Sequence, residues 1–88
     1  MIEEIVVIQN KYGLHARPAA HLVKVAGHFK SDIKIVKDGL EVNGKSIMGV
    51  MMLAAEPGSE ITFLIDGEDE AEAMKAIKEL IAMNFHEE

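Results

Sequence analysis

Hydrophobic and polar positions follow two different periods along this chain, and together they predict seven elements. Runs rich in β-branched or alternating apolar residues predict strands, and apolar residues three or four positions apart predict helices. The predicted strands cover 2–8, the region around 33–35, 40–42 and 60–65. The predicted helices cover 16–27, 47–53 and a last segment whose apolar stripe runs from 73 to 81. The expected order is therefore βαββαβα.

Turn and cap residues separate these elements. Asp38-Gly39 is a hairpin signal between two strands, Gly27 is placed to end the first helix, and Ser46 is placed to begin the short middle one. Links of hairpin length favour an antiparallel or mixed sheet with helices packed on one face, an α+β sandwich. A ferredoxin-like split βαβ arrangement is the competing layout.

Length and charge narrow the class of protein. Eighty-eight residues make one domain, which we expect to span 1–88. The absence of cysteine excludes disulfides, zinc ribbons and thiol catalysis. The net charge of −6 and a pI near 5.1 argue against direct binding of nucleic acid. Residues 1–55 nevertheless carry a net charge of +2 and 56–88 one of −8, so the first part suits an acidic protein partner.

No segment predicts contact with a membrane. The longest apolar run is 50–55, far short of the roughly 20 residues that a membrane-spanning helix needs. The sequence begins without the basic and apolar regions of a signal peptide. We therefore expect a cytoplasmic protein.

The segment 13–20, Gly-Leu-His-Ala-Arg-Pro-Ala-Ala, places His15 where a loop ends and the first helix begins. The first-turn N–H groups and the dipole of a helix favour an anion at that place. A neutral imidazole can accept a phosphoryl group, which would then lie against the amides of Ala16 and Arg17. The Arg17 guanidinium could also reach the phosphoryl oxygens in a forked geometry. The alternative is that His15 only caps the helix and Arg17 is a solvated charge.

A second segment, 43–52, contains Gly44-Lys45-Ser46. A nucleotide-binding phosphate loop needs an earlier glycine at a fixed distance before Gly-Lys-Ser. Counted back from Gly44, that glycine is expected at position 40, which is leucine, so we expect no nucleotide there. Ser46 is most simply an N-cap, and a phosphate on it would be well placed against the helix dipole.

The helix after Ser46 is apolar on almost every side. A helix of about seven residues in a small domain cannot bury every face, so we expect Val50 and Leu53 in the core. At least two of the other four apolar residues should be exposed as an adaptable docking surface: Ile47, Met48, Met51 and Met52.

The remaining chemistry-bearing residues suggest no further site. The four histidines are not paired with carboxylates at ligand spacing, so we expect no metal and no cofactor. The acidic run 66–72 is better explained as the start of a helix. His21 and His28 are expected on the surface, and His86 in a loose tail.

The two segments together resemble the signatures of the histidine-containing phosphocarrier family HPr, of the bacterial phosphoenolpyruvate-dependent sugar phosphotransferase system. Segment 13–20 is similar to the phosphorylatable-histidine signature, and segment 45–50, Lys-Ser-Ile-Met-Gly-Val, to the regulatory-serine signature. The likeness covers essentially the whole chain. It implies an HPr-like open-faced β-sandwich: a four-stranded antiparallel sheet covered on one face by three helices.

The resemblance also implies roles. His15 would accept a phosphoryl group on Nδ1 from phosphorylated enzyme I and pass it to an enzyme IIA, so the protein would be a carrier and not an enzyme. Arg17 and the Ala16 amide would stabilise the phosphoryl group. Ser46 would be the target of HPr kinase/phosphorylase, and its phosphate would repel enzyme I or recruit a catabolite-control regulator. Residues of the first two helices would form the docking face, with Lys24 as its basic rim: Ala16, Ala20, Ile47, Met48 and Met51. We expect a monomer, because this face must remain open.

Three alternatives remain open at this point. The first is an HPr-like regulator similar to Crh, which acts through Ser46; the intact segment around His15 counts against it. The second is a nitrogen-related or dihydroxyacetone-kinase phosphocarrier, with the same chemistry and other partners. The third is a ferredoxin-like sensor of a small molecule, which would bind a metabolite and form no phosphohistidine.

Overall fold

The computed structural model describes residues 1–86, which form one four-stranded antiparallel sheet and its helices. The strands are β1 (Ile2–Val7), β2 (Asp32–Lys37), β3 (Leu40–Asn43) and β4 (Glu60–Asp66). The helices are α1 (Ala16–Ala26), α2 (Ile47–Met52) and α3 (Glu70–Ala82), followed by a 3₁₀ turn, η1 (Asn84–His86). The predicted order βαββαβα is confirmed, and η1 is the addition that the periodicity did not reveal.

The strand order is β1-β4-β2-β3, so the last strand in sequence lies between the first two. Thr62 of β4 pairs with Ile5 of β1 on one side and with Val36 of β2 on the other. Alternate residues of β4 are fully buried, because the side chains of a strand point to opposite faces in turn. One face of the sheet is thus apolar and faces the core.

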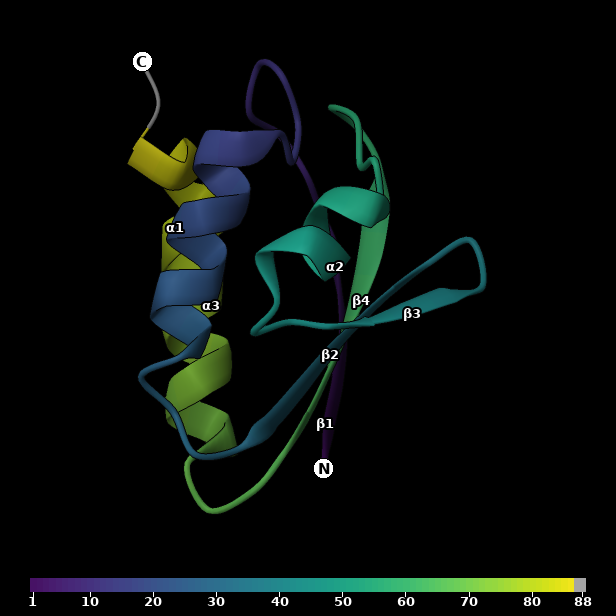
Figure 1. Cartoon of the computed structure of the whole chain (residues 1–88). Helices are drawn as coiled ribbons and strands as arrows, with labels where there is room; N and C mark the ends of the chain where they lie inside the picture. The colour runs from purple at the N-terminus through teal and green to yellow at the C-terminus, as the bar shows by residue number, and fades with distance from the viewer. Residues whose placement is uncertain (87–88) are drawn as a thin grey trace.

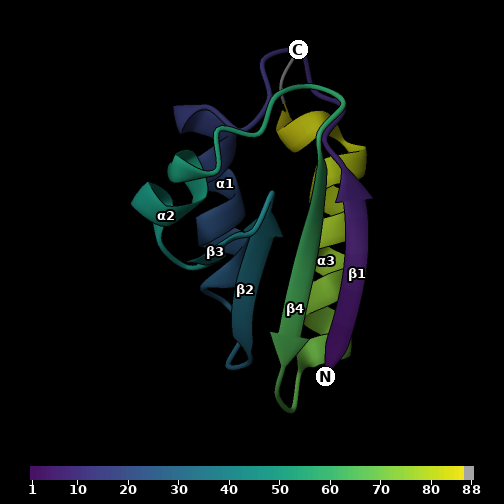
Figure 2. The same ribbon diagram turned by 90° about the vertical axis from the view of Figure 1, so that its right-hand side faces the viewer.

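All three helices lie on that one face (Figures 1 and 2). Helices α1 and α3 run side by side, and the short α2 lies next to α1 above β2 and β3. The opposite face has no cover within residues 1–86, and Ile5 there is 62% exposed. This is the expected open-faced β-sandwich.

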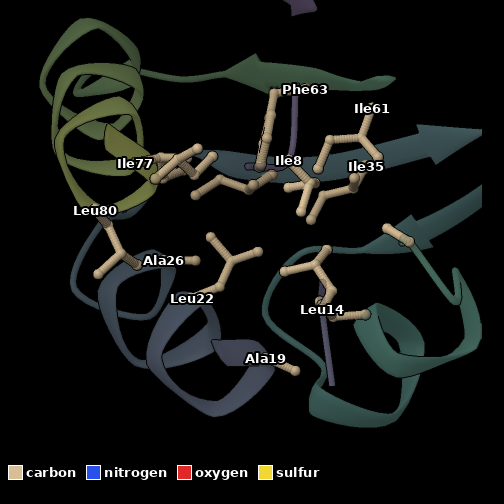
Figure 3. Packing of buried hydrophobic residues seen from close by; sticks show 14 of the residues in the cluster. Ile8, Leu14, Ala19, Leu22, Ala26, Ile35, Ile61, Phe63, Ile77 and Leu80 are labelled. Atoms are coloured by element: carbon tan, nitrogen blue, oxygen red, sulfur yellow. The ribbon is translucent and has the colours of Figure 1, made fainter. Parts of the chain in front are cut away.

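The core lies between the sheet and the helices (Figure 3). Phe63 and Ile35 point from the sheet toward Leu22 of α1 and Ile77 of α3, and all four are fully buried. Val50 and Leu53 are buried as predicted. The core therefore fixes the position of α1, whose first residues carry the segment singled out above.

The C-terminal prediction was wrong for His86, which belongs to η1 and not to a loose tail. Residues Asn84, Phe85 and His86 all have positive φ, between 51° and 61°. Phe85 is only 1% exposed, so its burial accounts for a backbone conformation that such residues rarely adopt. The imidazole of His86 lies 6.1 Å from that of the half-buried His21.

None of the helices within residues 1–86 is both long and apolar enough to span a membrane.

Candidate functional site

The loop before α1 is held closed by its own hydrogen bonds. The Gly13 N–H donates to the Asn10 carbonyl over 3.3 Å, and the Asn10 side-chain amide donates back to the Gly13 carbonyl over 2.8 Å. Asn10 is only 2% exposed. The Leu14 N–H donates to the carbonyl of Ala55, which lies beyond α2, over 2.8 Å. These bonds fix the backbone immediately before His15.

His15 is the N-cap residue of α1. Its backbone is extended, with φ −80° and ψ −171°, and its carbonyl accepts from the Ala19 N–H over 2.9 Å. Its side chain makes no capping hydrogen bond to the helix, and the residue is exposed. The imidazole is therefore not the group that caps the helix, which removes the plainest alternative to a chemical role.

The first turn of α1 offers two amides in the residues that directly follow His15. The first N–H groups of a helix have no carbonyl partner within it. Pro18 has no N–H, and the Ala19 N–H already bonds His15, so those of Ala16 and Arg17 remain available to an anion. Ala16 and Arg17 are exposed. Two free amides and the positive end of the helix dipole thus lie at the position of one histidine, and Arg17 is the second residue after it.

Tyr12 lies beside the same imidazole. Its ring centroid is 5.8 Å from that of His15, and the two ring planes meet at 84°, an edge-to-face arrangement. Lys11 places its ammonium 5.3 Å from the Tyr12 ring centroid. Tyr12 itself is 64% exposed, so it stands outside the loop and not beneath it.

Ser46 is the N-cap of α2, as predicted. Its hydroxyl oxygen accepts from the Gly49 N–H over 3.1 Å, and its carbonyl accepts from the Val50 N–H over 2.9 Å. The residue is half-buried. The hydroxyl therefore lies at the positive end of a short helix, where added negative charge is tolerated.

The reason given above for excluding a nucleotide-binding loop was wrong. The motif has four residues between its two glycines, and Gly39 and Gly44 have this spacing. The structure supplies a different reason: residues 40–43 form β3 and pair with β2, so they do not wrap around a phosphate. The Lys45 ammonium donates to the Phe29 carbonyl over 2.7 Å. This segment is a β-hairpin and a helix cap.

The predicted docking residues lie on the exposed sides of α1 and α2, which pack against each other (Figure 1). Met48 is 72% exposed, and the exposed apolar residues of α2 are Ile47, Met48, Met51 and Met52. Ala16, Ala20 and Lys24 of α1 are exposed too. We refer to Ala16, Ala20, Lys24, Ile47, Met48 and Met51 as the docking patch. It combines small and apolar side chains with one lysine at its margin.

Two structural residues escaped the sequence analysis. Asn10 belongs to a segment that indicates a turn, but its side chain is buried and donates to the Gly13 carbonyl. Asp69 was expected only to favour the dipole of α3. Instead its carboxylate accepts from the Lys30 N–H over 2.8 Å, from the Ser31 N–H over 2.9 Å and from the Ser31 hydroxyl. These bonds, that of the Ser31 hydroxyl foremost, lower the pKa of Asp69 to about 2.

No three His, Asp or Glu side chains within residues 1–86 gather closely enough to hold a metal ion.

A protein-family model described as "PTS HPr component phosphorylation site" matches residues 2–83. The chain belongs to the HPr family. The HPr phosphocarrier protein of Cupriavidus necator is 52% identical over 87 residues, which cover 99% of this chain and 98% of that protein. The HPr-like protein Crh of Halalkalibacterium halodurans is 53% identical over 77 residues, or 88% of this chain and 92% of that one.

Solved HPr structures also match the fold. A crystal structure of HPr from Thermoanaerobacter tengcongensis superposes with a TM-score of 0.95 at 48% identity, covering 100% of this chain and 99% of that one. The fold implied by the sequence resemblance is thus confirmed, and the chain is an HPr phosphocarrier of the phosphotransferase system.

Proposed function

We propose that this HPr-family chain accepts a phosphoryl group on Nδ1 of His15 from phosphorylated enzyme I and passes it to a histidine of an enzyme IIA. The observation that carries the proposal is the position of the imidazole. His15 is exposed at the start of α1, its side chain plays no part in capping, and the residues of the two first-turn amides follow it directly in the chain. A nucleophile in that place has its product charge stabilised in advance.

The transfer needs little covalent chemistry from the protein. A lone pair on Nδ1 of His15 forms a new P–N bond as the P–N bond to the enzyme I histidine breaks, and the donor imidazole leaves with the electron pair of that bond. Phosphoryl transfer depends mainly on positioning and on stabilising charge on the equatorial oxygens. The Ala16 amide and the Arg17 guanidinium supply that stabilisation on this chain.

The docking patch supports a brief encounter with each partner. Its apolar residues on α2 are exposed in an adaptable methionine-rich surface, and Lys24 and Arg17 give it a basic margin. Complementary charge raises the association rate more than the affinity, which suits a carrier that must leave each partner quickly. A monomer keeps this patch open, and a carrier with these partners works in the cytoplasm.

The direct test uses enzyme I, Mg²⁺ and phosphoenolpyruvate, with intact mass and phosphorus NMR as readouts. The wild-type chain should gain one phosphate that is labile in acid and stable in base. His15→Ala should gain none, and its free energy of unfolding should change by less than about 0.5 kcal/mol, because an exposed side chain without a capping bond is lost.

His28→Ala is the matched control, since His28 is an exposed histidine just beyond the other end of α1. It should be phosphorylated like the wild type. Phosphate on the His15→Ala chain, or none on the folded wild-type chain, would contradict the proposal.

We propose further that Ser46 is a regulatory phosphorylation site and the substrate of an HPr kinase/phosphorylase. Its phosphate would also recruit a catabolite-control regulator. A phosphoserine at an N-cap is compatible with the fold and places a dianion next to Ile47 and Met48 of the docking patch. The similarity to a Crh protein supports a regulatory role of this kind.

The charge effect can be separated from the cap. Ser46→Asp and Ser46→Asn both keep a side-chain acceptor for the Gly49 N–H, and only the former adds charge. Phosphorylation of His15 by an acidic enzyme I should be about tenfold less efficient in Ser46→Asp, and close to wild type in Ser46→Asn. Equal loss in both variants would attribute the effect to the cap and refute the electrostatic mechanism.

A further inference from the structure

Methionine is concentrated on the shortest helix of the chain, α2, where it is exposed. Three of the six methionines stand there, at positions 48, 51 and 52. The exposed fraction is 72% for Met48, 44% for Met51 and 65% for Met52. Residues three and four positions apart lie on one face of a helix, so the three thioethers form one surface. Met48 and Met51 belong to the docking patch, and Met52 adjoins it.

The other methionines provide a contrast within the same chain. Met74 of α3 is 4% exposed and belongs to the core, whereas Met83, which follows α3, is 55% exposed. Met1 is exposed on its own at β1. The chain contains no cysteine, so no thiol of its own competes for an oxidant. An oxidant in solution therefore meets a cluster of thioethers only on α2.

From this arrangement we propose that Met48, Met51 and Met52 form a reversible oxidation site that controls docking, with a hydroperoxide as the oxidant. The thioether sulfur donates a lone pair to one peroxide oxygen, and an S–O bond forms as the O–O bond breaks. The departing hydroxide takes the proton that remains on the transferred oxygen and becomes water. Sulfur loses two electrons and the peroxide gains them, which leaves a methionine sulfoxide.

The product changes the character of the docking patch without adding charge. A sulfoxide is polar and carries an oxygen that accepts hydrogen bonds, and in the free chain water can satisfy that oxygen. When the patch is buried against a partner, the oxygen loses water and gains no donor from an apolar surface. The half-saturating concentration of the chain for enzyme I should therefore rise about tenfold on oxidation. The proposal rests on the phosphoryl transfer proposed above, because it concerns regulation of the same patch.

The modification itself is tested on the folded wild-type chain with hydrogen peroxide and peptide mapping by mass spectrometry. Met48, Met51 and Met52 should gain one oxygen each, while Met74 should stay reduced until denaturant unfolds the chain. A rate of oxidation for Met74 in the folded chain equal to the rates on α2 would overturn the proposal.

The consequence is measured with untreated enzyme I after the peroxide has been removed, and each chain is compared with its own unoxidised form. The wild type should lose affinity about tenfold. Reduction by methionine sulfoxide reductases, one for each sulfoxide epimer, should restore it. A chain that combines Met48→Leu, Met51→Leu and Met52→Leu keeps apolar side chains and should not respond to peroxide.

Met83→Leu is the matched control, since it removes an exposed methionine outside α2 and outside the docking patch. Its response to peroxide should equal that of the wild type. An equal loss of affinity in the triple leucine chain, or a loss abolished by Met83→Leu, would refute the proposal.

Salt separates this effect from that of a phosphate on Ser46. Oxidation adds no charge, so its effect on the half-saturating concentration should be the same at low and high salt, whereas an effect of charge is screened. An oxidation effect that disappears at high salt would contradict the proposed loss of solvation.

The same measurements distinguish the two proposals. If the unoxidised wild type takes no phosphate, the proposed function fails and the effect on docking fails with it, while the peptide map still decides whether α2 is oxidised selectively. If the wild type takes phosphate equally well before and after oxidation of α2, only the oxidation switch is overturned.

Discussion

At the scale of one residue, Gly13 shows how closely the loop before α1 packs against residue 55. Its φ of +72° lies in the region that favours glycine, and a Cβ on it would overlap the carbonyl oxygen of Ala55. That carbonyl is the one that accepts from the Leu14 N–H. Glycine at this position therefore allows the loop to approach residue 55 and sets the position of His15.

A pair of alanine substitutions separates conformational strain from this close approach. Gly39 also has a positive φ, +82°, but a Cβ there would meet no atom within 4 Å. Gly39→Ala should cost about 1–2 kcal/mol of unfolding free energy, the cost of a left-handed alanine. Gly13→Ala should cost more and slow phosphorylation of His15. Chemical denaturation and the enzyme I assay measure both, and equal stability losses would disprove the fitted contact.

At the scale of elements, local sequence signals correctly predicted the strands, turns and caps that depend on interactions between near neighbours in the chain. The alternation in 33–35, the hairpin at Asp38-Gly39 and the cap at Ser46 all predicted the elements that form. The predicted start of α3 was also correct, but Asp69 bonds across the fold to Ser31 and Lys30. No periodicity reports such a contact, because its partners lie nearly forty positions apart. The bonds of Asn10 to Gly13 are local, but a turn signal does not show which of its side chains will be buried.

The hydrogen bonds accepted by the Asp69 carboxylate predict that the stability of the fold depends on pH. They join the loop before β2 to the start of α3. Its pKa falls from 3.8 to about 2 on folding, so the carboxylate stabilises the fold above pH 3.8, and this contribution is lost as the pH falls from 3.8 toward 2. Asp69→Asn should therefore be less stable than wild type at pH 7, and the difference should narrow below pH 4.

The measurement is denaturant unfolding of the two chains between pH 7 and pH 2. Asp32→Asn, at an exposed aspartate of β2, serves as the control and should follow the wild-type curve. A difference between Asp69→Asn and wild type that stays constant down to pH 2 would show that the charge of Asp69 is not the stabilising feature.

For the whole molecule, the order of elements in the sequence predicted the class of fold. The resemblance to the HPr family added the expectation that three helices cover one face of the sheet. The strand order β1-β4-β2-β3 does not follow from periodicity, because it depends on which strands bury their apolar faces together. The segment around His15 predicted a histidine at a helix start, as found. The precise placement of Tyr12 beside it depends on a loop closed by Asn10 and anchored at Ala55, which only the folded chain reveals.

The pairing of β1 with β4 has a consequence for how the protein is made. Val7 pairs with Glu60 and Ile2 with Ile65, so the first strand to leave the ribosome waits for the last one to be synthesised. The β2–β3 hairpin can close early, because its partners are neighbours in sequence. A sheet that relies on such distant pairing forms slowly compared with a bundle of helices. The nascent chain therefore completes its sheet only after residue 66 has emerged.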